Sequence, residues 1–540
     1  DGSQAMKIEF VGGARTVTGS SYILTTDRCT IMIDCGMFQG NAALRDRNAL
    51  GLIYAPKKID ALLLTHAHID HSGLIPKLVK EGFENKIFAT SATVDLCAIM
   101  LPDSAHIQES DAEWRTRKQR KRGEPGVEPL YTMADAEKAV QFFVPVRYDD
   151  LVDIAPGVRA RFRDDGHILG SAFIELMVED GGTTRTIVFS GDIGSSDQAI
   201  IRDPELPDNA DVLFIESTYG DRLHKSKKDT YEEFKNIILE SHNRKGNIII
   251  PSFAVERTQE IIYTLGKLFA AGDIPRIPVY IDSPLAINAT EVFLRNTAYF
   301  DDEMKQLLAS GVNPLEFPNL TFVRTTEESI ALNKDAKGSI IISASGMCTA
   351  GRIKFHLANN LYRPESSVIF VGFQAEGTLG RMLVDGATRV KIYGEDVVVK
   401  SRIYTLGGFS GHADRDGLLA WMSRIKNEKL TVFVIHGEER SSLALADSIK
   451  ERFGYTTYVP RWGEIVDIDT LQSSMAQYGT HAAPTAPPLE GDIERVLGSI
   501  TGALDRYREA VRNNRADEMR KFESRLAELK AVLQSLEEDQ

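Results

Sequence analysis

The sequence predicts an α/β protein in which two strand-rich segments flank a segment where strands alternate with helices. Residues 6–218 and 401–470 contain short β-branched runs that end at glycine or polar turns. Residues 219–400 contain short apolar runs separated by amphipathic helical sequence, which is typical of a parallel sheet covered by helices. Apolar side chains recur at helical spacing in residues 493–540, so a helical hairpin is expected there.

The first strand-rich segment is expected to form a series of strands with one helical interruption. The strand sequences are KIEFVGG, SYILTT, CTIMIDCG, ALLLTHAH, SAFIELMV, TIVFSGD and VLFIEST. Residues 91–140 are instead polar and helical in pattern, and they carry the basic run WRTRKQRKR from Trp114 to Arg122. That run indicates either a solvated helix face or an edge that contacts phosphates, and both interpretations stay open.

The middle segment has the pattern of a further sheet. TYEEFKNIILESHN and ERTQEIIYTLGKLFAAG are predicted helices, and NIIIPSF, PVYIDS, SIIISAS and SVIFVGF are predicted strands. In a parallel sheet of this kind, the loops at the carboxyl ends of the strands face the ligand. After Val397 the sequence becomes strand-rich again, in VVVKSRIYTLGGFSGHAD and TVFVIHGEE, until about Asp469.

The last part of the chain is expected to be a linker followed by a helical tail. Residues 480–492 are rich in Pro and Ala, as linkers often are. Two apolar stripes follow, separated by Asn513 and Asn514: Ile493, Leu497, Ile500, Leu504, Tyr507 and Val511, then Met519, Phe522, Leu526, Leu529, Leu533 and Leu536. Such stripes must be buried, either on the rest of the chain or on a second copy, and we expect a homodimer.

Composition narrows the class of protein. With 43% hydrophobic and 26% charged residues the chain can bury large cores, and its apolar runs stay short of the roughly 20 residues that a membrane helix needs. We therefore expect no membrane contact. Four cysteines without a CxxC pair suit a reducing cytoplasm, and residues 1–5, before Met6, are expected to be a cloning remnant. A net charge of −14 argues against indiscriminate nucleic-acid binding, although a local basic groove would suffice for a specific one.

A cluster of metal-binding residue types follows the predicted strand ALLLT. His66, His68, Asp70 and His71 lie within six residues, on the turn after that strand. Imidazole nitrogens and carboxylate oxygens are ligands that zinc accepts. The alternative is a surface histidine cluster without metal, but side chains of these types are expected to converge only where an ion holds them together. The motif therefore predicts a metal site.

Three further ligand candidates lie at the ends of later strands or turns. His167 precedes the strand that begins near Ser171, Asp192 ends TIVFSGD, and His436 ends TVFVIHG. The first cluster leaves its metals short of protein ligands, so these residues are expected to complete the site. Five other histidines lie in helical or polar sequence and are expected at the surface: His106, His224, His242, His356 and His481.

These residues resemble the metallo-β-lactamase superfamily. The resemblance implies an αββα sandwich with two zinc ions at the edge between its sheets. It implies that His66, His68, His167 and Asp192 hold the first zinc, and that Asp70, His71, Asp192 and His436 hold the second. Asp34, at the end of an earlier strand, would orient a ligand from the second shell.

Three more motifs resemble the β-CASP branch of that superfamily: Glu216 in FIESTYG, His412 in GFSGHAD and His436 in VIHGE. Residues 219–400 have the length and pattern of the inserted β-CASP domain, with the family-like strings PSFAVERTQE, DSPLA, SASGM and GFQAEGTLGR. In this family the third motif is His in RNA-processing members and Val in DNA-repair members. His436 therefore indicates the RNA-processing type, similar to the pre-mRNA 3′-end cleavage nucleases and RNase J-like bacterial enzymes.

The resemblance implies a zinc-dependent ribonuclease that acts on single-stranded RNA through a hydroxide shared by the two zinc ions. Asp70 would orient that hydroxide. His412, kept protonated by Glu216, would donate a proton to the leaving ribose oxygen. Whether cutting is internal or proceeds from the 5′ end stays open.

Candidate phosphate contacts lie in the middle segment. Ser343, Ser345 and Gly346 follow a predicted strand, where hydroxyls and backbone N–H groups can hold a phosphate. Arg352, Arg381 and Arg257 are the candidate charge partners. The alternative for each arginine is a structural salt bridge.

Two other functions stay possible at this level. A small-molecule ester or lactone hydrolase of the same fold would explain the ligands but not the insert of roughly 180 residues. A catalytically silent RNA-binding scaffold would be expected to have lost ligands, whereas every ligand position here is filled.

Overall fold

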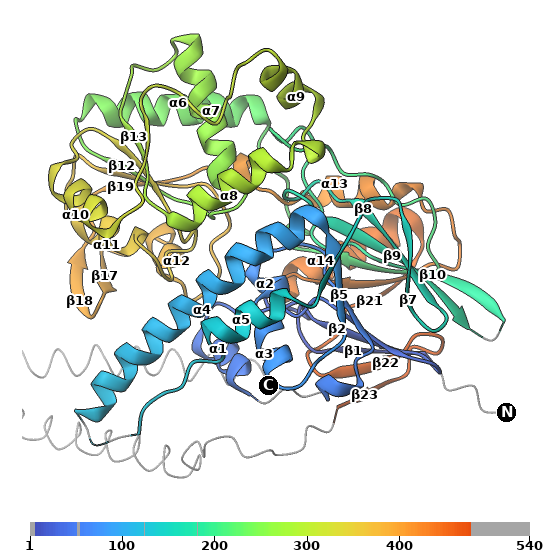
Figure 1. The fold of residues 1–540 in the computed structure, drawn as a ribbon. Helices are drawn as coiled ribbons and strands as arrows, with labels where there is room; N and C mark the ends of the chain where they lie inside the picture. Colours follow the sequence, from blue (N-terminus) through green and yellow to red (C-terminus); the bar gives the residue numbers. More distant parts are fainter. Residues whose placement is uncertain (1–5, 51–54, 122, 124, 181, 477–540) are drawn as a thin grey trace, which may run out of the picture. The chain divides into compact units, whose positions relative to one another are not determined.

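The computed structural model describes residues 6–50, 55–121, 123, 125–180 and 182–476 (Figure 1). The predicted linker (480–492) and helical hairpin (493–540), with the apolar stripes behind the homodimer prediction, lie outside the described residues. None of the described helices is long and apolar enough to cross a membrane. All four cysteines lie among the described residues and are buried.

Two large β-sheets pack against each other. The first has the order β23-β22-β1-β2-β3-β4-β5-β6, and the second β21-β20-β11-β10-β9-β8-β7. The strands of the first sheet are β1 (Lys7–Phe10), β2 (Tyr22–Thr25), β3 (Thr30–Ile33), β4 (Ala61–Leu63), β5 (Lys86–Thr90), β6 (Phe143–Val146), β22 (Glu464–Asp467) and β23 (Ser473–Met475). Those of the second are β7 (Leu151–Ala155), β8 (Val158–Asp164), β9 (Ala172–Asp180), β10 (Thr183–Phe189), β11 (Val212–Glu216), β20 (Thr431–Ile435) and β21 (Thr456–Tyr458).

A core of aromatic and aliphatic side chains fills the space between these sheets. The rings of Phe189, Phe214 and Phe433 stack in a row, with centroids 4.2 Å and 4.7 Å apart. Phe10 of the first sheet lies 5.8 Å from Phe433 of the second, so the two sheets share one core. Such offset aromatic contacts add to the stabilisation that apolar burial provides.

Helices cover the outer faces of both sheets. The first is covered by α3 (Ile75–Lys80), α4 (Ser91–Arg120) and α5 (Met133–Val140), and the second by α13 (Arg415–Trp421) and α14 (Glu439–Phe453). The predicted αββα sandwich is therefore confirmed. Two further helices, α1 (Ala42–Ala49) and α2 (Ile69–Ser72), lie in loops of the first sheet, and single 3-10 turns span Pro56–Lys58, Thr297–Tyr299, Gly407–Phe409 and Met422–Arg424.

A parallel six-stranded sheet forms the inserted domain. Its order is β14 (Leu320–Phe322), β13 (Val279–Ile281), β15 (Ile340–Ser343), β12 (Ile248–Pro251), β16 (Ser367–Phe370) and β19 (Arg402–Thr405). Its helices are α6 (Lys227–Asn243), α7 (Arg257–Ala271), α8 (Pro284–Arg295), α9 (Asp302–Ala309), α10 (Thr326–Asp335), α11 (Ile353–Asn360) and α12 (Leu379–Val384), and a hairpin of β17 (Arg389–Ile392) and β18 (Glu395–Val398) is attached.

Burial on both faces explains the continuous apolar runs of these strands. In β12, Ile248 and Ile250 pack with the cluster that includes α6, α7 and α8, while Ile249 packs on the opposite face with α11 and α12. β19 lies beyond residue 400, the predicted end of the insert, yet it pairs with β16. That strand is part of the inserted sheet.

The topology brings the functional motifs to one edge of the sandwich. β10, β11 and β20 are parallel neighbours, so their carboxyl ends lie together. Asp192, Glu216 and His436 stand at or just after those ends. β3 and β4, parallel in the other sheet, end next to Asp34 and the turn that begins at Thr65.

Candidate metal centre

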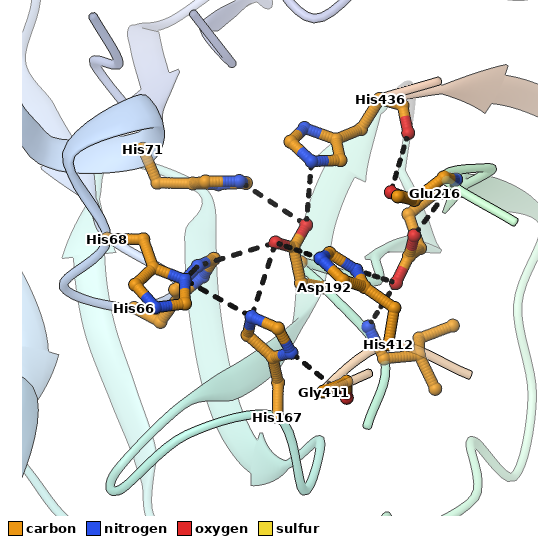
Figure 2. A network of polar contacts seen from close by, with 12 residues as sticks. His66, His68, His71, His167, Asp192, Glu216, Gly411, His412 and His436 are labelled. Carbon is orange, nitrogen blue, oxygen red and sulfur yellow. Dashed lines mark hydrogen bonds and ion pairs between the residues drawn. The ribbon is translucent and has the colours of Figure 1, made fainter. Parts of the chain in front are cut away.

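The carboxylate of Asp192 lies among several imidazoles, four of which come within 3.5 Å of its oxygens (Figure 2). Its Oδ2 atom lies 3.5 Å from Nε2 of both His66 and His167. Its Oδ1 atom lies 3.3 Å from Nε2 of both His71 and His436. The two oxygens of one side chain thus face two different pairs of histidines. This is the arrangement that a carboxylate shared between two metal ions requires.

The first ligand set consists of Asp192 with three histidines whose nitrogens converge. Nδ1 of His68 lies 3.2 Å from Nε2 of His66 and 3.2 Å from Nε2 of His167. Burial, reinforced by the neighbouring histidines, lowers the pKa of His68 to about 3 and the pKa values of His66 and His167 well below their usual range. The imidazoles are therefore neutral at physiological pH, which leaves their lone pairs free for a cation.

The second set consists of Asp70, His71 and His436, whose ligand atoms lie within 4.8 Å of one another. Among the described residues, Nε2 of His71 and Oδ1 of Asp192 are buried without a hydrogen-bond partner. Orphaned buried polar atoms are rare and costly, and a metal ion would satisfy both. The nitrogen and carboxylate donors of both sets fit zinc.

Asp34 holds the second set in place from behind. One of its carboxylate oxygens, Oδ2, accepts a 2.7 Å hydrogen bond from Nδ1 of His71. The same carboxylate accepts hydrogen bonds from the backbone N–H and the hydroxyl of Thr65, at 2.8 and 3.0 Å. Asp34 therefore contacts both the His71 ring and Thr65, at the start of the turn that carries the candidate ligands, a position from which it could orient that ring.

Three further groups contact the histidine rings from the side away from Asp192, and the sequence gives no signal of them. Nδ1 of His66 lies 3.0 Å from the Thr65 hydroxyl, Nδ1 of His167 lies 3.2 Å from the Gly411 carbonyl, and Nδ1 of His436 lies 2.6 Å from the Ser20 hydroxyl. Each contact occupies the ring nitrogen that faces away from Asp192 and so directs Nε2 toward it. Small polar residues and a backbone carbonyl could be assigned this role only from the structure.

His412 and Glu216 stand beside the two sets. Nδ1 of His412 lies 3.0 Å from Oε1 of Glu216, and its Nε2 lies 3.9 Å from Oδ2 of Asp192. Glu216 is completely buried, and backbone N–H groups of Ile193 and Thr218 donate to its oxygens at 2.7 and 3.1 Å. Although burial opposes it, the carboxylates of Glu216 and Asp192 raise the pKa of His412 to about 9.

Glycines allow the ligand loops to approach closely. A Cβ atom on Gly36 would lie 1.7 Å from the carbonyl oxygen of Asp70, and one on Gly194 would lie 1.8 Å from the carbonyl oxygen of Gly166. Both positions press a ligand loop against its neighbour, with no room for a side chain.

Of the six residues predicted to contact phosphates, two lie near the metal centre and four make contacts within the inserted domain. Arg257 borders the metal centre, since its Nη2 lies 3.1 Å from where a Cβ of Gly411 would stand, and it pairs with Glu260. Gly346 packs against Phe253, whose ring centroid lies 6.2 Å from that of His68. The other four make internal contacts: Ser343 with Asp282 O, Ser345 with Ala350, Arg352 with Asp282 and Arg381 with Asp385.

One of the histidines expected at the surface is not there. His356 is completely buried, and its Nε2 lies 2.7 Å from the carboxylate of Asp282, which also pairs with Arg352. His224 is partly buried, and its Nε2 lies 3.1 Å from the carbonyl oxygen of His412. The surface prediction is wrong for His356 because its partner Asp282 is distant in sequence, so the local helical pattern did not reveal it.

The fold and the site define a metal-dependent hydrolase. Three family models match: the metallo-beta-lactamase superfamily at residues 14–89, the Beta-Casp domain at 258–383, and the Zn-dependent metallo-hydrolase RNA specificity domain at 396–460. Ribonuclease TTHA0252 of Thermus thermophilus is 37% identical over 464 residues, which cover 86% of this chain and 100% of the relative. Transcription termination factors FttA of Methanocaldococcus jannaschii and Thermococcus kodakarensis are each 31% identical, over 85% of this chain and 71% and 70% of theirs. This chain belongs to the β-CASP family of metallo-β-lactamase nucleases.

Proposed function

We propose that this chain is a zinc-dependent ribonuclease that binds two zinc ions and hydrolyses phosphodiester bonds in single-stranded RNA. The observation that carries the proposal is the divided environment of Asp192, whose two carboxylate oxygens face separate pairs of histidines. The match of residues 396–460 to an RNA specificity domain, and a ribonuclease among the relatives, support RNA as the substrate.

Each ligand set would hold one ion. The first is His66, His68, His167 and Asp192, and the second is Asp70, His71, His436 and Asp192. Bound zinc would supply the nucleophile for hydrolysis, since a metal ion lowers the pKa of water from about 15.7 toward 7. Asp70, on the short helix α2, would orient the nucleophile through its carboxylate.

His412 is the proposed proton donor to the leaving ribose oxygen. Its Nδ1 is engaged by Glu216, so Nε2 is the atom left to face the substrate. The buried Glu216 carboxylate, fixed by two backbone N–H groups, favours the imidazolium form that a general acid needs. The charge of bound zinc would offset part of the rise in the pKa of His412.

We also propose a cellular location and an oligomeric state for this ribonuclease. Four cysteines without a CxxC pair, all of them buried, support a reducing, cytoplasmic location. The homodimer prediction rests on residues 493–540, outside the described part of the chain.

The test is cleavage of 5′-labelled single-stranded RNA by the zinc-loaded protein, with DNA of the same sequence and an Asp70→Ala/His71→Ala variant as controls. We expect RNA cleavage that the double variant loses, and the product ladder would separate internal from 5′-end cutting. If neither polymer is cut although two zinc ions are bound, a small-molecule ester substrate or a silent scaffold would replace this proposal.

A further inference from the structure

Two aromatic side chains are displayed on the surface of the inserted domain. Phe355 of α11 and Tyr393 of the β17–β18 turn are each 51% exposed, with ring centroids 4.7 Å apart and planes inclined by 30°. Nζ of Lys354 lies 4.7 Å from the centroid of the Tyr393 ring. A large apolar pair that stays half exposed and carries a cation on one ring is not explained by packing of the core.

The backbone at Tyr393 adds to this anomaly. Ile392 pairs with Glu395, so Tyr393 and Gly394 alone form the hairpin turn, with φ values of +55° and +89°. A turn with two positive φ values favours Asn or Gly at its first position, and a bulky residue is an outlier there. The hairpin thus holds an aromatic ring at its tip against the conformational preference of that residue.

The outer half of α4 presents a similar surface opposite this hairpin. Trp114 is 57% exposed, and Nζ of Lys118 lies 5.2 Å from its ring centroid. Between Asp111 and Lys121 there are five basic and two acidic residues, and within the described part of the chain the only ion pair of those basic side chains joins Arg117 to Glu113. The chain as a whole has a net charge of −14, so this is a local basic surface.

The two surfaces lie close to each other. Burial, and next the carboxylate of Asp111 on α4, raise the pKa of Tyr393 to about 12, which requires the hairpin turn to stand near that part of the helix. Figure 1 shows the β17–β18 hairpin extending toward the outer half of α4.

The helix also connects this surface to the metal centre. Thr90, the N-cap of α4, donates a hydrogen bond to the carbonyl of Gly170, in the same loop as the ligand His167. From there α4 runs outward for 30 residues. At 1.5 Å per residue, Trp114 lies roughly 36 Å along the helix from Thr90.

We propose that Trp114, Phe355 and Tyr393, with Lys118 and Lys354, form a binding surface for single-stranded RNA at a distance from the metal centre. Exposed aromatic rings stack on bases of any sequence, and neighbouring lysines neutralise phosphates, which is how nonspecific single-strand binding surfaces work. The surface would hold the part of a long RNA that extends beyond the centre. This inference rests on the proposed ribonuclease function for its choice of partner.

The test is a binding measurement that needs no cleavage. The dissociation constant of the zinc-loaded protein for fluorescent phosphorothioate RNA, which resists hydrolysis, is measured by anisotropy for a short oligomer and for one several times longer. A Trp114→Ala/Phe355→Leu/Tyr393→Leu variant should bind the long RNA at least about fivefold more weakly, because each stacked base contributes measurably to affinity. Its affinity for the short oligomer should stay within twofold of wild type.

Controls separate stacking from unfolding and from general surface effects. The single variant Tyr393→Phe keeps a ring and should retain wild-type affinity for long RNA, whereas Leu443→Ala, which shortens another exposed side chain on α14, should change nothing. Lys118→Gln/Lys354→Gln should flatten the salt dependence of long-RNA binding, while Lys426→Gln/Lys429→Gln should not.

Unchanged long-RNA affinity in the triple variant would overturn the proposal. A shift in oligomeric state with unchanged RNA affinity would also overturn it and assign the surface to a second copy of the chain. Failure of the ribonuclease proposal is distinguishable, because it would show as absent cleavage by wild type while the length-dependent binding can still be measured.

Discussion

At the residue scale, the two oxygens of Asp192 organise the centre. Although burial opposes ionisation, His436 and His71 lead the neighbours that hold the pKa of this carboxyl well below its usual range. Residue type, order along the chain and the family resemblance suggested the candidate ligands, and the structure brings these side chains close together. Ser20, Thr65 and Gly411 were not predictable, because any hydroxyl or carbonyl can accept an imidazole N–H and only the fold decides which one is near.

Replacing His412 tests its role as proton donor. We expect His412→Ala to reduce the turnover number on RNA by about 10²- to 10⁴-fold, the usual contribution of a general acid, with the zinc content still near two per chain. Steady-state kinetics and elemental analysis on the same preparation measure both quantities. Glu216→Gln should show a smaller loss of turnover, again with zinc retained. If the His412→Ala variant instead loses zinc, His412 is a metal ligand. Its position beside Asp192 and Glu216 is compatible with that role.

Replacing Asp34 tests orientation of the second ligand set. Asp34→Ala removes the acceptor for Nδ1 of His71, so zinc affinity should fall by about 10- to 100-fold, as for other second-shell changes. Competition with a chromogenic chelator measures this affinity. Asp153→Ala, at an exposed position of β7, is the matched control and should leave it unchanged. Equal affinities in the two variants would contradict an orienting role.

At the scale of elements, strand ends and tight loops place the ligands. The strands were predictable because short β-branched runs bounded by turns have few alternative structures. The helical stretch predicted over residues 91–140 is in fact two helices, α4 and α5. α4 is 30 residues long in all and is not interrupted at Pro102. The sequence could not show this, since a proline inside a helical pattern usually suggests an end.

Gly194 tests how closely the ligand loops must approach. Gly194→Ala would place a methyl group 1.8 Å from the Gly166 carbonyl, so the loops carrying His167 and Asp192 should separate. We expect a lower melting temperature and loss of zinc, measured by calorimetry and elemental analysis. Gly407→Ala has nothing within 4 Å of the added methyl group and should match wild type in both. Normal zinc content in Gly194→Ala would show that these loops tolerate separation.

At the scale of the whole molecule, the centre joins parts of the chain that are far apart in sequence. The turn at residues 65–71 follows β4 of the first sheet and His436 follows β20 of the second, and they meet because the two sheets pack on one shared core. The resemblance to the family motifs predicted that these two segments lie together, whereas the secondary-structure pattern of either segment alone could not. The pairing of His356 with Asp282, across 74 positions, shows the same limit, and so does the inclusion of β19 in the inserted sheet.

Removing the metals should destabilise the whole molecule. Ions that bind only the folded state stabilise it by about 4 kcal/mol when present at 1,000 times their dissociation constant. We therefore expect the melting temperature to fall by several degrees after chelation and to return with added zinc. The Asp70→Ala/His71→Ala variant should respond much less, and a chelated wild type that melts as before would argue against a folded-state metal centre.

The most direct test of the shared-carboxylate centre is anomalous X-ray diffraction at the zinc absorption edge, on crystals of the zinc-loaded protein. We predict two anomalous peaks about 3.5–4 Å apart, one on each side of the Asp192 carboxylate. His66, His68 and His167 should surround the first peak, and His71, His436 and Asp70 the second. A single peak, or two peaks that do not share Asp192, would contradict the account.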